Sequence, residues 1–305
     1  MVTDHGKDYV DFIPGVSPIH VSDLPSFFHG SDQRVSKLAL ECVWELDKAQ
    51  FVLVNTVYEL EAEAIEALRA KFHFPIYPIG PAIPIEDKTA KFSPASQSTQ
   101  ASYLRWLDSQ PEDSVLYISL GSFLSVPDAQ MEEIIAGVRK SGARFLWVAR
   151  GDSLERVIEK CGDFRGLVVP WCDQLRVLCH PSIGGLWTHC GWNSTLEGAF
   201  AGVPMLAFPI YFDQIPNAKQ IVEDWKVGWR VRSGGKGIGR AVTRDEISEM
   251  VKRLMDPENG EGSEIRRRAR EVGVLCRRAV EEGGSAQDNV DVLMKDMIHF
   301  AKAIE

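Results

Sequence analysis

Short apolar runs alternate with amphipathic stretches along most of the chain. Six runs in the second part are each long enough for one buried strand: "SVLYISLGS", "RFLWVAR", "GLVVP", "IGGLWTH", "PMLAFP" and "VGWRV". Helical spacing of apolar residues marks "DAQMEEIIAGVRKSG", "NSTLEGAFAG" and "QIPNAKQIVEDWK" between them, and it continues from Thr243 to Ile304. This alternation predicts an α/β domain with a mostly parallel, doubly wound sheet.

The first part of the chain shows the same alternation in a shorter form. After a loop-rich start and an amphipathic helix around "RVSKLALECVWELDKA", "QFVLVNTVYEL" (50–60) predicts a strand, "EAEAIEALRAKF" (61–72) a helix and "PIYPIGP" (75–81) a second strand. Two strands and two helices are too few for a parallel sheet that is covered on both faces. We therefore predict that this part belongs to a Rossmann-like domain whose beginning is missing.

A polar, serine-rich stretch without hydrophobic period, "IPIEDKTAKFSPASQSTQ", separates the two parts. This composition is typical of an interdomain linker. We therefore expect a partial first domain at 1–82, the linker at 83–100 and a complete domain at 101–283. Residues 284–305 predict a last helix that packs back toward the first domain.

The composition argues against several classes of protein. The 305 residues carry a net charge of −9, and the densest basic run, "RRRAR", spreads over several faces of a helix, so neither nucleic acid nor an anionic membrane is an expected partner. No secretory signal follows Met1, and no apolar run approaches the ~20 residues of a membrane span. The six cysteines form no CxxC pair, which favours free thiols in a reducing, cytoplasmic setting. Nothing points to an obligate protein partner.

The stretch "WTHCGWNSTLEGAFAGVP" (187–204) carries the most unusual chemistry. An apolar strand ends, Gly191 follows, and helix-starting residues come next, among them Asn193, Ser194 and Glu197. Taken alone, this pattern predicts a capped helix. At the carboxyl edge of a parallel sheet, however, a helix start also carries free N–H groups and about half a positive charge, so it is an anion site.

Two Cys–His pairs raise the question of a metal site. His189 precedes Cys190, and Cys179 precedes His180. Adjacent residues on a strand point to opposite faces, so neither pair is suited to holding one ion. The chain also has no Asp-x-Asp motif. We therefore expect no metal.

The wider context of this stretch resembles a known family. Residues 171–214, "WCDQLRVLCHPSIGGLWTHCGWNSTLEGAFAGVPMLAFPIYFDQ", closely resemble the signature box of plant UDP-glycosyltransferases, with its Trp-x-x-Gln start, His-Cys-Gly-Trp-Asn-Ser-x-x-Glu centre and Asp/Glu-Gln end. "IPGVSPIHVSDLP", "LRWLDSQPEDSVLYISLGS" and "EEGGSAQDN" also resemble this family, so the resemblance covers essentially the whole chain. It implies a GT-B fold, which has two Rossmann-like α/β domains. Asp173 departs from the proline common at its position, and we expect its charge to face solvent.

The resemblance implies a site for a UDP-sugar, which is a co-substrate rather than a cofactor. Trp171 would stack on uracil, Cys172 would meet the uracil edge through its backbone, and Gln174 and Glu197 would bind the ribose hydroxyls. A final glutamine in the box usually accompanies glucose as the donor sugar. The remaining positions are Ser122, His189, Asn193 and Ser194 for the diphosphate, and Trp192, Asp213 and Gln214 for the sugar.

The reaction that the resemblance implies is an inverting, metal-independent transfer of a hexose to a hydroxyl or carboxyl of a small lipophilic acceptor. Flavonoids, other phenolics, terpenoids and hormones are the range of the family. Its general base is a histidine early in the first domain, oriented by an aspartate. None of His5, His20, His29 and His73 fits that position, so we nominate no base. The alternative is a UDP-sugar-binding fragment or pseudoenzyme without turnover.

Two other enzyme classes match the sequence poorly. A dinucleotide-dependent oxidoreductase would carry G-x-G-x-x-G between its first strand and helix, but "GGKGIG" follows a late strand and predicts a flexible loop. A serine hydrolase would carry a G-x-S-x-G elbow, and the chain has none.

Overall fold

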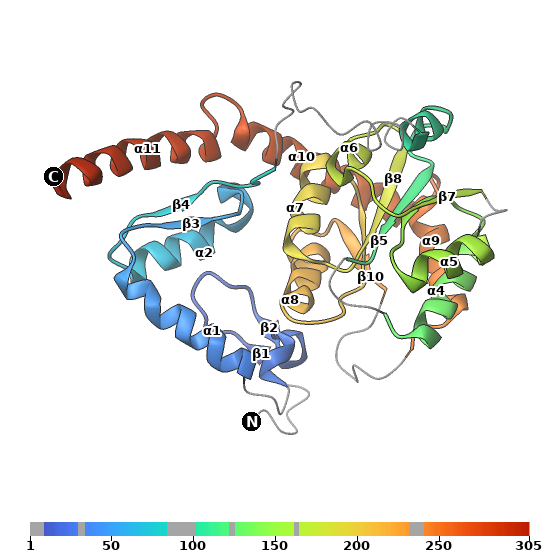
Figure 1. The fold of residues 1–305 in the computed structure, drawn as a ribbon, viewed down its shortest axis with the longest axis horizontal. Coiled ribbons are helices and arrows are strands. Elements are labelled where there is room, and N and C mark those ends of the chain that lie inside the picture. The colour runs from blue at the N-terminus through green and yellow to red at the C-terminus, as the bar shows by residue number, and fades with distance from the viewer. Residues whose placement is uncertain are drawn as a thin grey trace.

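The computed structural model describes residues 9–29, 34–83, 102–121, 126–161, 165–231 and 241–304. Figure 1 shows two parts, with the N-terminal elements on one side and a larger sheet on the other. A long last helix reaches from the second part back over the first. The glycine-rich stretch at 233–240 and nearly all of the expected linker lie outside the described residues, so both stay predictions.

Six strands form the sheet of the C-terminal part: β5 (Val115–Ser119), β6 (Arg144–Val148), β7 (Gly166–Val169), β8 (Ile183–Thr188), β9 (Met205–Ala207) and β10 (Gly228–Arg230). All neighbours pair in parallel, in the order β10-β9-β8-β5-β6-β7. The chain therefore runs outward from the centre twice, which confirms the predicted doubly wound sheet. The order reverses between β5 and β8, and such switch points hold the ligand sites of open α/β sheets.

Helices cover both faces of this sheet. Alternate residues of β5 face different layers: Leu116 and Ile118 pack into one core and Tyr117 into the other, and each is at most 1% exposed. Figure 1 shows the two layers on opposite sides of the strands. One layer holds α4 (Asp128–Ser141), α5 (Asp152–Cys161) and α9 (Arg244–Met255), and the other holds α6 (Gln174–Leu178), α7 (Trp192–Ala201), α8 (Gln214–Lys219), its π-helical extension η4 (Gln220–Asp224) and α10 (Gly260–Val280).

The N-terminal part contains two small sheets. The first is the antiparallel pair β1 (Tyr9–Val10) and β2 (Ile19–His20), and the second is the parallel pair β3 (Val52–Val54) and β4 (Ile76–Pro78). The last helix, α11 (Ser285–Ile304), lies along β4 in Figure 1, where the Tyr77 hydroxyl donates to Asp296. The remaining elements are η1 (Val21–Asp23), η2 (Ser26–Phe28), α1 (Arg34–Glu45), η3 (Leu46–Lys48) and α2 (Tyr58–Lys71), and residues 102–108 are also helical.

Several elements differ from the sequence prediction. The strand predicted at 50–60 ends at Val54, and α2 begins at Tyr58, three residues before the predicted helix. The polar pair Asn55 and Thr56 ends the strand, and acidic residues suit the first turn of the helix that follows. Helix α5 was absent from the prediction, although Leu154, Val157, Ile158 and Cys161 have helical spacing.

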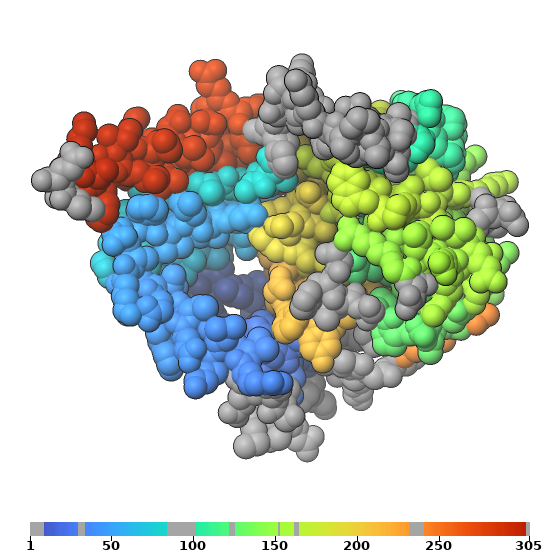
Figure 2. All heavy atoms as spheres, in the orientation of Figure 1, coloured from blue at the N-terminus to red at the C-terminus, as the bar shows by residue number. Residues whose placement is uncertain are grey.

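Polar contacts join the two parts. Asp23 accepts from Arg230 at 2.6 Å, and both side chains are nearly buried. Glu61 accepts from Gln220 at 3.0 Å. Figure 2 shows this face hollowed between the blue N-terminal elements and the yellow and orange segment that contains α7 and α8. Within the described ranges, no helix combines the length and the apolar character that crossing a membrane requires.

Candidate functional site

A cavity of about 460 Å³ lies at the carboxyl ends of β5, β6, β7 and β8. This is the switch point of the sheet, where a ligand site is expected. Most of the residues predicted from the sequence come together here, although they derive from two separate segments, which follow β7 and β8. The predicted residues that line the cavity are Trp171, Cys172, Gln174, His189, Trp192, Asn193, Ser194 and Glu197.

Helix α7 begins at this cavity without a side-chain cap. Gly191 occupies the cap position, and Thr195 N is the first amide to donate within the helix, to Gly191 O at 3.0 Å. Asn193 and Ser194 are therefore inside the first turn, and the prediction that they cap the helix is wrong. Cys190, directly before this cap, has a φ of +64°, which residues other than glycine adopt uncommonly. The first amides of α7 thus face the cavity with the positive end of the helix dipole.

The imidazole of His189 occupies a slot between two glycines. A Cβ atom at Gly121 would lie 2.8 Å from the ring, and one at Gly191 would lie 2.5 Å from its Nε2. Gly121 also has a φ of +87°, which other residues rarely adopt. Glycine is therefore required at the ends of both β5 and β8 to hold this ring against the start of α7.

Burial lowers the pKa of His189, and the nearby Ser119 backbone and Asp213 carboxylate only partly oppose this effect. Its Nδ1 is buried without a hydrogen-bond partner among the described residues. The ring is therefore neutral near pH 7 and offers one N–H donor. Because charge develops on a leaving diphosphate, a fixed donor beside a helix start suits its stabilisation.

The opposite end of the cavity presents the Trp171 indole, which is 45% exposed and available for stacking. The following turn is fixed by Asp173, whose backbone N–H donates to the Tyr103 phenol oxygen at 3.1 Å. The Asp173 carboxylate accepts from Arg176 N at 3.2 Å and caps α6. This cap is an exposed one, so it is compatible with our expectation that the charge of Asp173 faces solvent. Asp173 replaces the rigidity of the family's usual proline with a helix cap.

Gln174 and Glu197, which the resemblance assigns to the ribose, both line the cavity and contact each other. The Gln174 amide donates to the Glu197 carboxylate and, at 2.8 Å, to the Ser194 hydroxyl. Burial raises the pKa of Glu197, and the bond from Gln174 acts in the opposite direction. The carboxylate is thus held in place beside an indole at one end and a helix start at the other.

Two predicted residues lie outside the cavity lining, and a third is not described. Asp213 and Gln214, at the start of α8, are not among the residues that line the cavity. The Asp213 carboxylate accepts from the Asn217 side-chain amide at 2.9 Å. The side-chain oxygen Oε1 of Gln214 accepts from Ile210 N and Tyr211 N, each at 2.9 Å. Ser122 lies outside the described residues.

Trp192 connects the cavity to the N-terminal part. Its indole N–H donates to Asn55 O at 2.7 Å, and the Asn55 amide donates to Asn193 Oδ1 at 3.4 Å. Sequence reasoning missed Asn55, although its polar side chain directly follows β3. It also missed Tyr117, in the middle of β5, and Gly121 and Arg150, which lie beyond the ends of β5 and β6; all three line the cavity. The switch-point rule applied to each predicted strand end would have found the last two.

The histidines of the N-terminal part show no catalytic arrangement in the described residues. His20 Nδ1 lies 2.6 Å from the Ser22 hydroxyl and accepts from Ser22 N at the start of η1. His73 packs edge-on against Phe74. His5 lies outside the described residues, so the absence of a general base stays a prediction. In the described part of the chain, no three His, Cys, Asp or Glu side chains gather to hold a metal ion.

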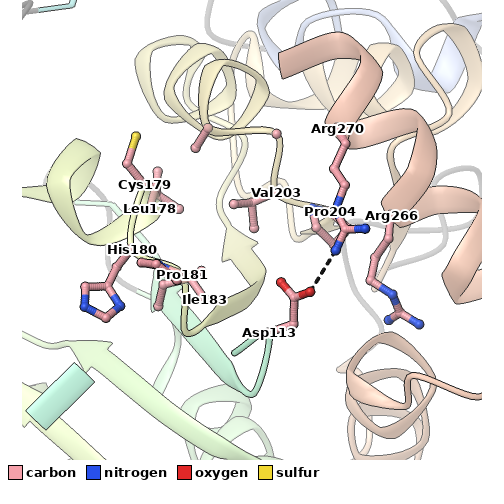
Figure 3. A pocket seen from close by; sticks show the side chains of 12 residues that line it. Asp113, Leu178, Cys179, His180, Pro181, Ile183, Val203, Pro204, Arg266 and Arg270 are labelled. Atoms are coloured by element: carbon pink, nitrogen blue, oxygen red, sulfur yellow. Dashed lines mark hydrogen bonds and ion pairs between the residues drawn. The ribbon is translucent and has the colours of Figure 1, made fainter. Parts of the chain in front are cut away.

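A second cavity, of about 170 Å³, lies at the opposite end of the sheet (Figure 3). Figure 3 shows Asp113 pointing toward Arg270, and the two pair at 2.7 Å. Arg266 donates to the carbonyl oxygens of Leu254 and Asp256 at 2.6 and 2.8 Å. Because these cations are already paired within the fold, the large cavity at the switch point is the better candidate for an anionic ligand.

Comparisons with known proteins show the family of the chain. The family model described as "UDP-glucoronosyl and UDP-glucosyl transferase" matches residues 35–256. UDP-glycosyltransferase 87A2 of Arabidopsis thaliana is 52% identical over 289 residues, which cover 95% of this chain and 62% of the relative.

Solved structures give the same result. UGT71G1 of Medicago truncatula, complexed with UDP-glucose, superposes with a TM-score of 0.81 at 32% identity, over 97% of this chain and 64% of that one. UGT2 of Phytolacca americana, complexed with UDP-2fluoro-glucose and pterostilbene, has a TM-score of 0.79 at 34% identity, over 93% and 61%. The GT-B fold expected from the resemblance is thus confirmed, and the chain spans less than two thirds of the length of these relatives. It belongs to the UDP-glucoronosyl and UDP-glucosyl transferase family.

Proposed function

We propose that the cavity at the switch point binds a UDP-sugar and that the chain supplies the donor side of an inverting glycosyl transfer. One observation carries this proposal: an exposed indole, a pair of hydroxyl-binding polar groups and an uncapped helix start line a single cavity. These are the three chemistries that a uracil ring, a ribose and a diphosphate require. The proposed binding and transfer steps use no metal ion.

The chain's own residues divide the work of binding. Trp171 stacks on the uracil, and Gln174 and Glu197 bind the ribose. The diphosphate lies against the first amides of α7, where the neutral His189 donates one hydrogen bond. As an acceptor oxygen attacks the anomeric carbon and the bond to UDP breaks, these fixed donors stabilise the charge that develops on the leaving group.

We further propose glucose as the sugar and a small lipophilic alcohol, phenol or carboxylic acid as the acceptor. Gln214 closes the signature box, and the two solved relatives hold UDP-glucose or its fluoro analogue, one of them together with pterostilbene. Trp192 is the part of the cavity closest to the N-terminal elements because its indole donates to Asn55. The sugar therefore belongs on this side, toward the acceptor.

Titration calorimetry of the 305-residue chain with UDP tests the binding step. We expect Trp171→Ala to weaken UDP binding about 10- to 100-fold, because base–aromatic stacking contributes ~1–3 kcal/mol. Trp44→Ala is the matched control, since Trp44 is a 67% exposed indole on α1. Absence of UDP binding by the unsubstituted chain, or equal losses in both variants, would overturn the proposal.

Turnover needs a separate measurement. The chain is incubated with UDP-glucose and a panel of phenols and carboxylic acids, and the products are followed by mass spectrometry. Glucoside formation supports the full proposal. UDP binding without any product favours a donor-binding chain that lacks a general base.

A further inference from the structure

A buried phenol lies beneath the cavity and has no part in the proposed chemistry. Tyr117, in the middle of β5, is 1% exposed. Its hydroxyl lies 3.0 Å from the Gln174 carbonyl oxygen and 3.3 Å from the Cys172 sulfur. A tyrosine that only filled the core would not need its hydroxyl at the floor of a polar cavity.

The direction of these hydrogen bonds follows from the number of protons. Burial raises the pKa of Tyr117 well above 10 and that of Cys172 to about 11, so both groups keep their protons near pH 7. The Gln174 carbonyl oxygen has no proton and must accept. The single phenol proton therefore goes to Gln174, and the phenol oxygen accepts from the thiol.

This bond decides which way the Gln174 amide points. With its oxygen toward Tyr117, its nitrogen faces the Ser194 hydroxyl and the Glu197 carboxylate, and both N–H groups are used. A flipped amide would place an N–H group against the phenol and its oxygen against a carboxylate. The orientation of the Gln174 amide therefore follows from its three partners Tyr117, Ser194 and Glu197.

The consequence is a fixed pattern of acceptors and donors toward a ligand. Gln174 has only the second lone pair of its oxygen left, and Glu197 offers carboxylate oxygens, so both are acceptors. Ser194 accepts from Gln174 and keeps its own proton to donate. Two neighbouring acceptors match a vicinal diol, and the hydroxyl donor beside them at the start of α7 matches a phosphate.

We propose that Tyr117 is a positioning residue, which orients the Gln174 amide and thereby makes the cavity selective for the two ribose hydroxyls of the nucleotide. This inference rests on the proposed binding of UDP. Tyr117 lies on β5, outside the signature box at 171–214, so the proposal adds a residue from outside the box to nucleotide selectivity.

Calorimetry with UDP and with 2′,3′-dideoxy-UDP tests the proposal. In the unsubstituted chain we expect UDP to bind at least tenfold more tightly, because a buried site built for hydroxyls rejects a ligand without them. Tyr117→Phe keeps the ring and removes the hydroxyl. We expect this variant to bind UDP about fivefold more weakly, to bind the dideoxy ligand as before, and so to lose most of the selectivity.

The control is Tyr77→Phe, which removes another hydrogen-bonded phenol from a 5% exposed residue on β4 that does not line the cavity. It should leave the ratio of the two dissociation constants unchanged. Gln174→Leu provides a second test that does not depend on the folding of Tyr117→Phe, and it should also lower the ratio.

The possible outcomes separate the two proposals. An unchanged ratio in Tyr117→Phe, or in Gln174→Leu, overturns the positioning role while UDP binding itself stands. An unsubstituted chain that binds UDP without discriminating against the dideoxy ligand also overturns it. Failure of the unsubstituted chain to bind UDP at all contradicts the proposed function instead.

Discussion

The two parts of the molecule differ in how fully they bury their apolar side chains. In the C-terminal part, every residue of β8 is buried, and Trp147 on β6 is 1% exposed. In the N-terminal part, α1 buries none of its residues, and its Leu38 and Trp44 are 61% and 67% exposed. The cavity therefore stands on a complete packing unit, whereas the β3–β4 sheet and its helices leave apolar surface uncovered.

This difference indicates where the determinants of donor binding lie. All predicted residues that line the cavity belong to the C-terminal part. The N-terminal part reaches the same region through Asn55, which accepts from Trp192 and donates to Asn193. UDP binding should thus depend on the C-terminal sheet, and the N-terminal part should act mainly on the sugar side.

The largest effect that tests this difference in burial is expected when one indole is removed from each part. Trp147→Ala deletes a fully buried side chain from the core between the sheet and the layer of α4, α5 and α9, so we expect a loss of about 3–5 kcal/mol in the free energy of unfolding. Trp44→Ala deletes an exposed one and should change it by less than about 0.5 kcal/mol. Urea unfolding followed by far-ultraviolet circular dichroism measures both. A loss of comparable size in the two variants would show that α1 is buried in solution.

The sequence predicts the packing of the second part well because its central apolar runs, such as β5 and β8, are strands buried on both faces. The run around Trp147 needs no further context to be recognised. The strand predicted at 50–60 is too long because Val57 and Leu60 continue its apolar pattern, although they belong to the turn and helix that follow. Apolar spacing alone does not distinguish these cases; the polar Asn55–Thr56 pair does.

A smaller loss of stability is expected from replacing Gly121, which contacts His189. Gly142, which does not, serves as the control. Gly142, at the end of α4, has a φ of +74° and open space around it, so Gly142→Ala should cost only the backbone strain, about 1–2 kcal/mol. Gly121→Ala has a similar φ and also meets the His189 ring, which adds ~1–3 kcal/mol.

Only Gly121→Ala should also weaken UDP binding, because it displaces the ring at the start of α7. Thermal unfolding and calorimetry on the same two proteins separate strain from displacement. Equal behaviour of the two variants would mean that the slot around His189 has no role in holding the diphosphate.

Two features of the cavity, the cap of α7 and the orientation of Tyr117, could not be predicted from the sequence. Asn193 and Ser194 are strong capping residues, yet the chain caps α7 at Gly191, directly after Cys190 in a left-handed conformation. A positive φ at a cysteine has no sequence signature. Tyr117 is similar: it lies on a strand that the sequence predicts, but the face it occupies, toward Gln174, is set by the register of β5 against its neighbours.

The smallest expected effect is the pH dependence of stability and ligand affinity that Glu197 causes. It tests directly whether Glu197 acts as an acceptor in the cavity. Burial is the main cause that raises the pKa of Glu197 above its usual 4.5, so the folded chain holds this proton more tightly than the unfolded chain does. Its contribution to stability is therefore fully present below pH 4.5 and is lost as the pH rises through the folded pKa. Ligand binding should have the opposite sign, because ribose hydroxyls need the ionised carboxylate as their acceptor.

Uridine is the appropriate ligand, since it lacks the titrating phosphate of UDP. We expect its dissociation constant to rise as the pH falls through the raised pKa of Glu197, with the weakening already visible above pH 4.5. Calorimetry in buffers of different ionisation enthalpy should show protons released on binding over the same range. Glu197→Gln keeps an acceptor oxygen but cannot titrate, so its uridine affinity should be lower and flat with pH. A pH dependence that survives in this variant would assign the titration to another group and remove Glu197 from the ribose site.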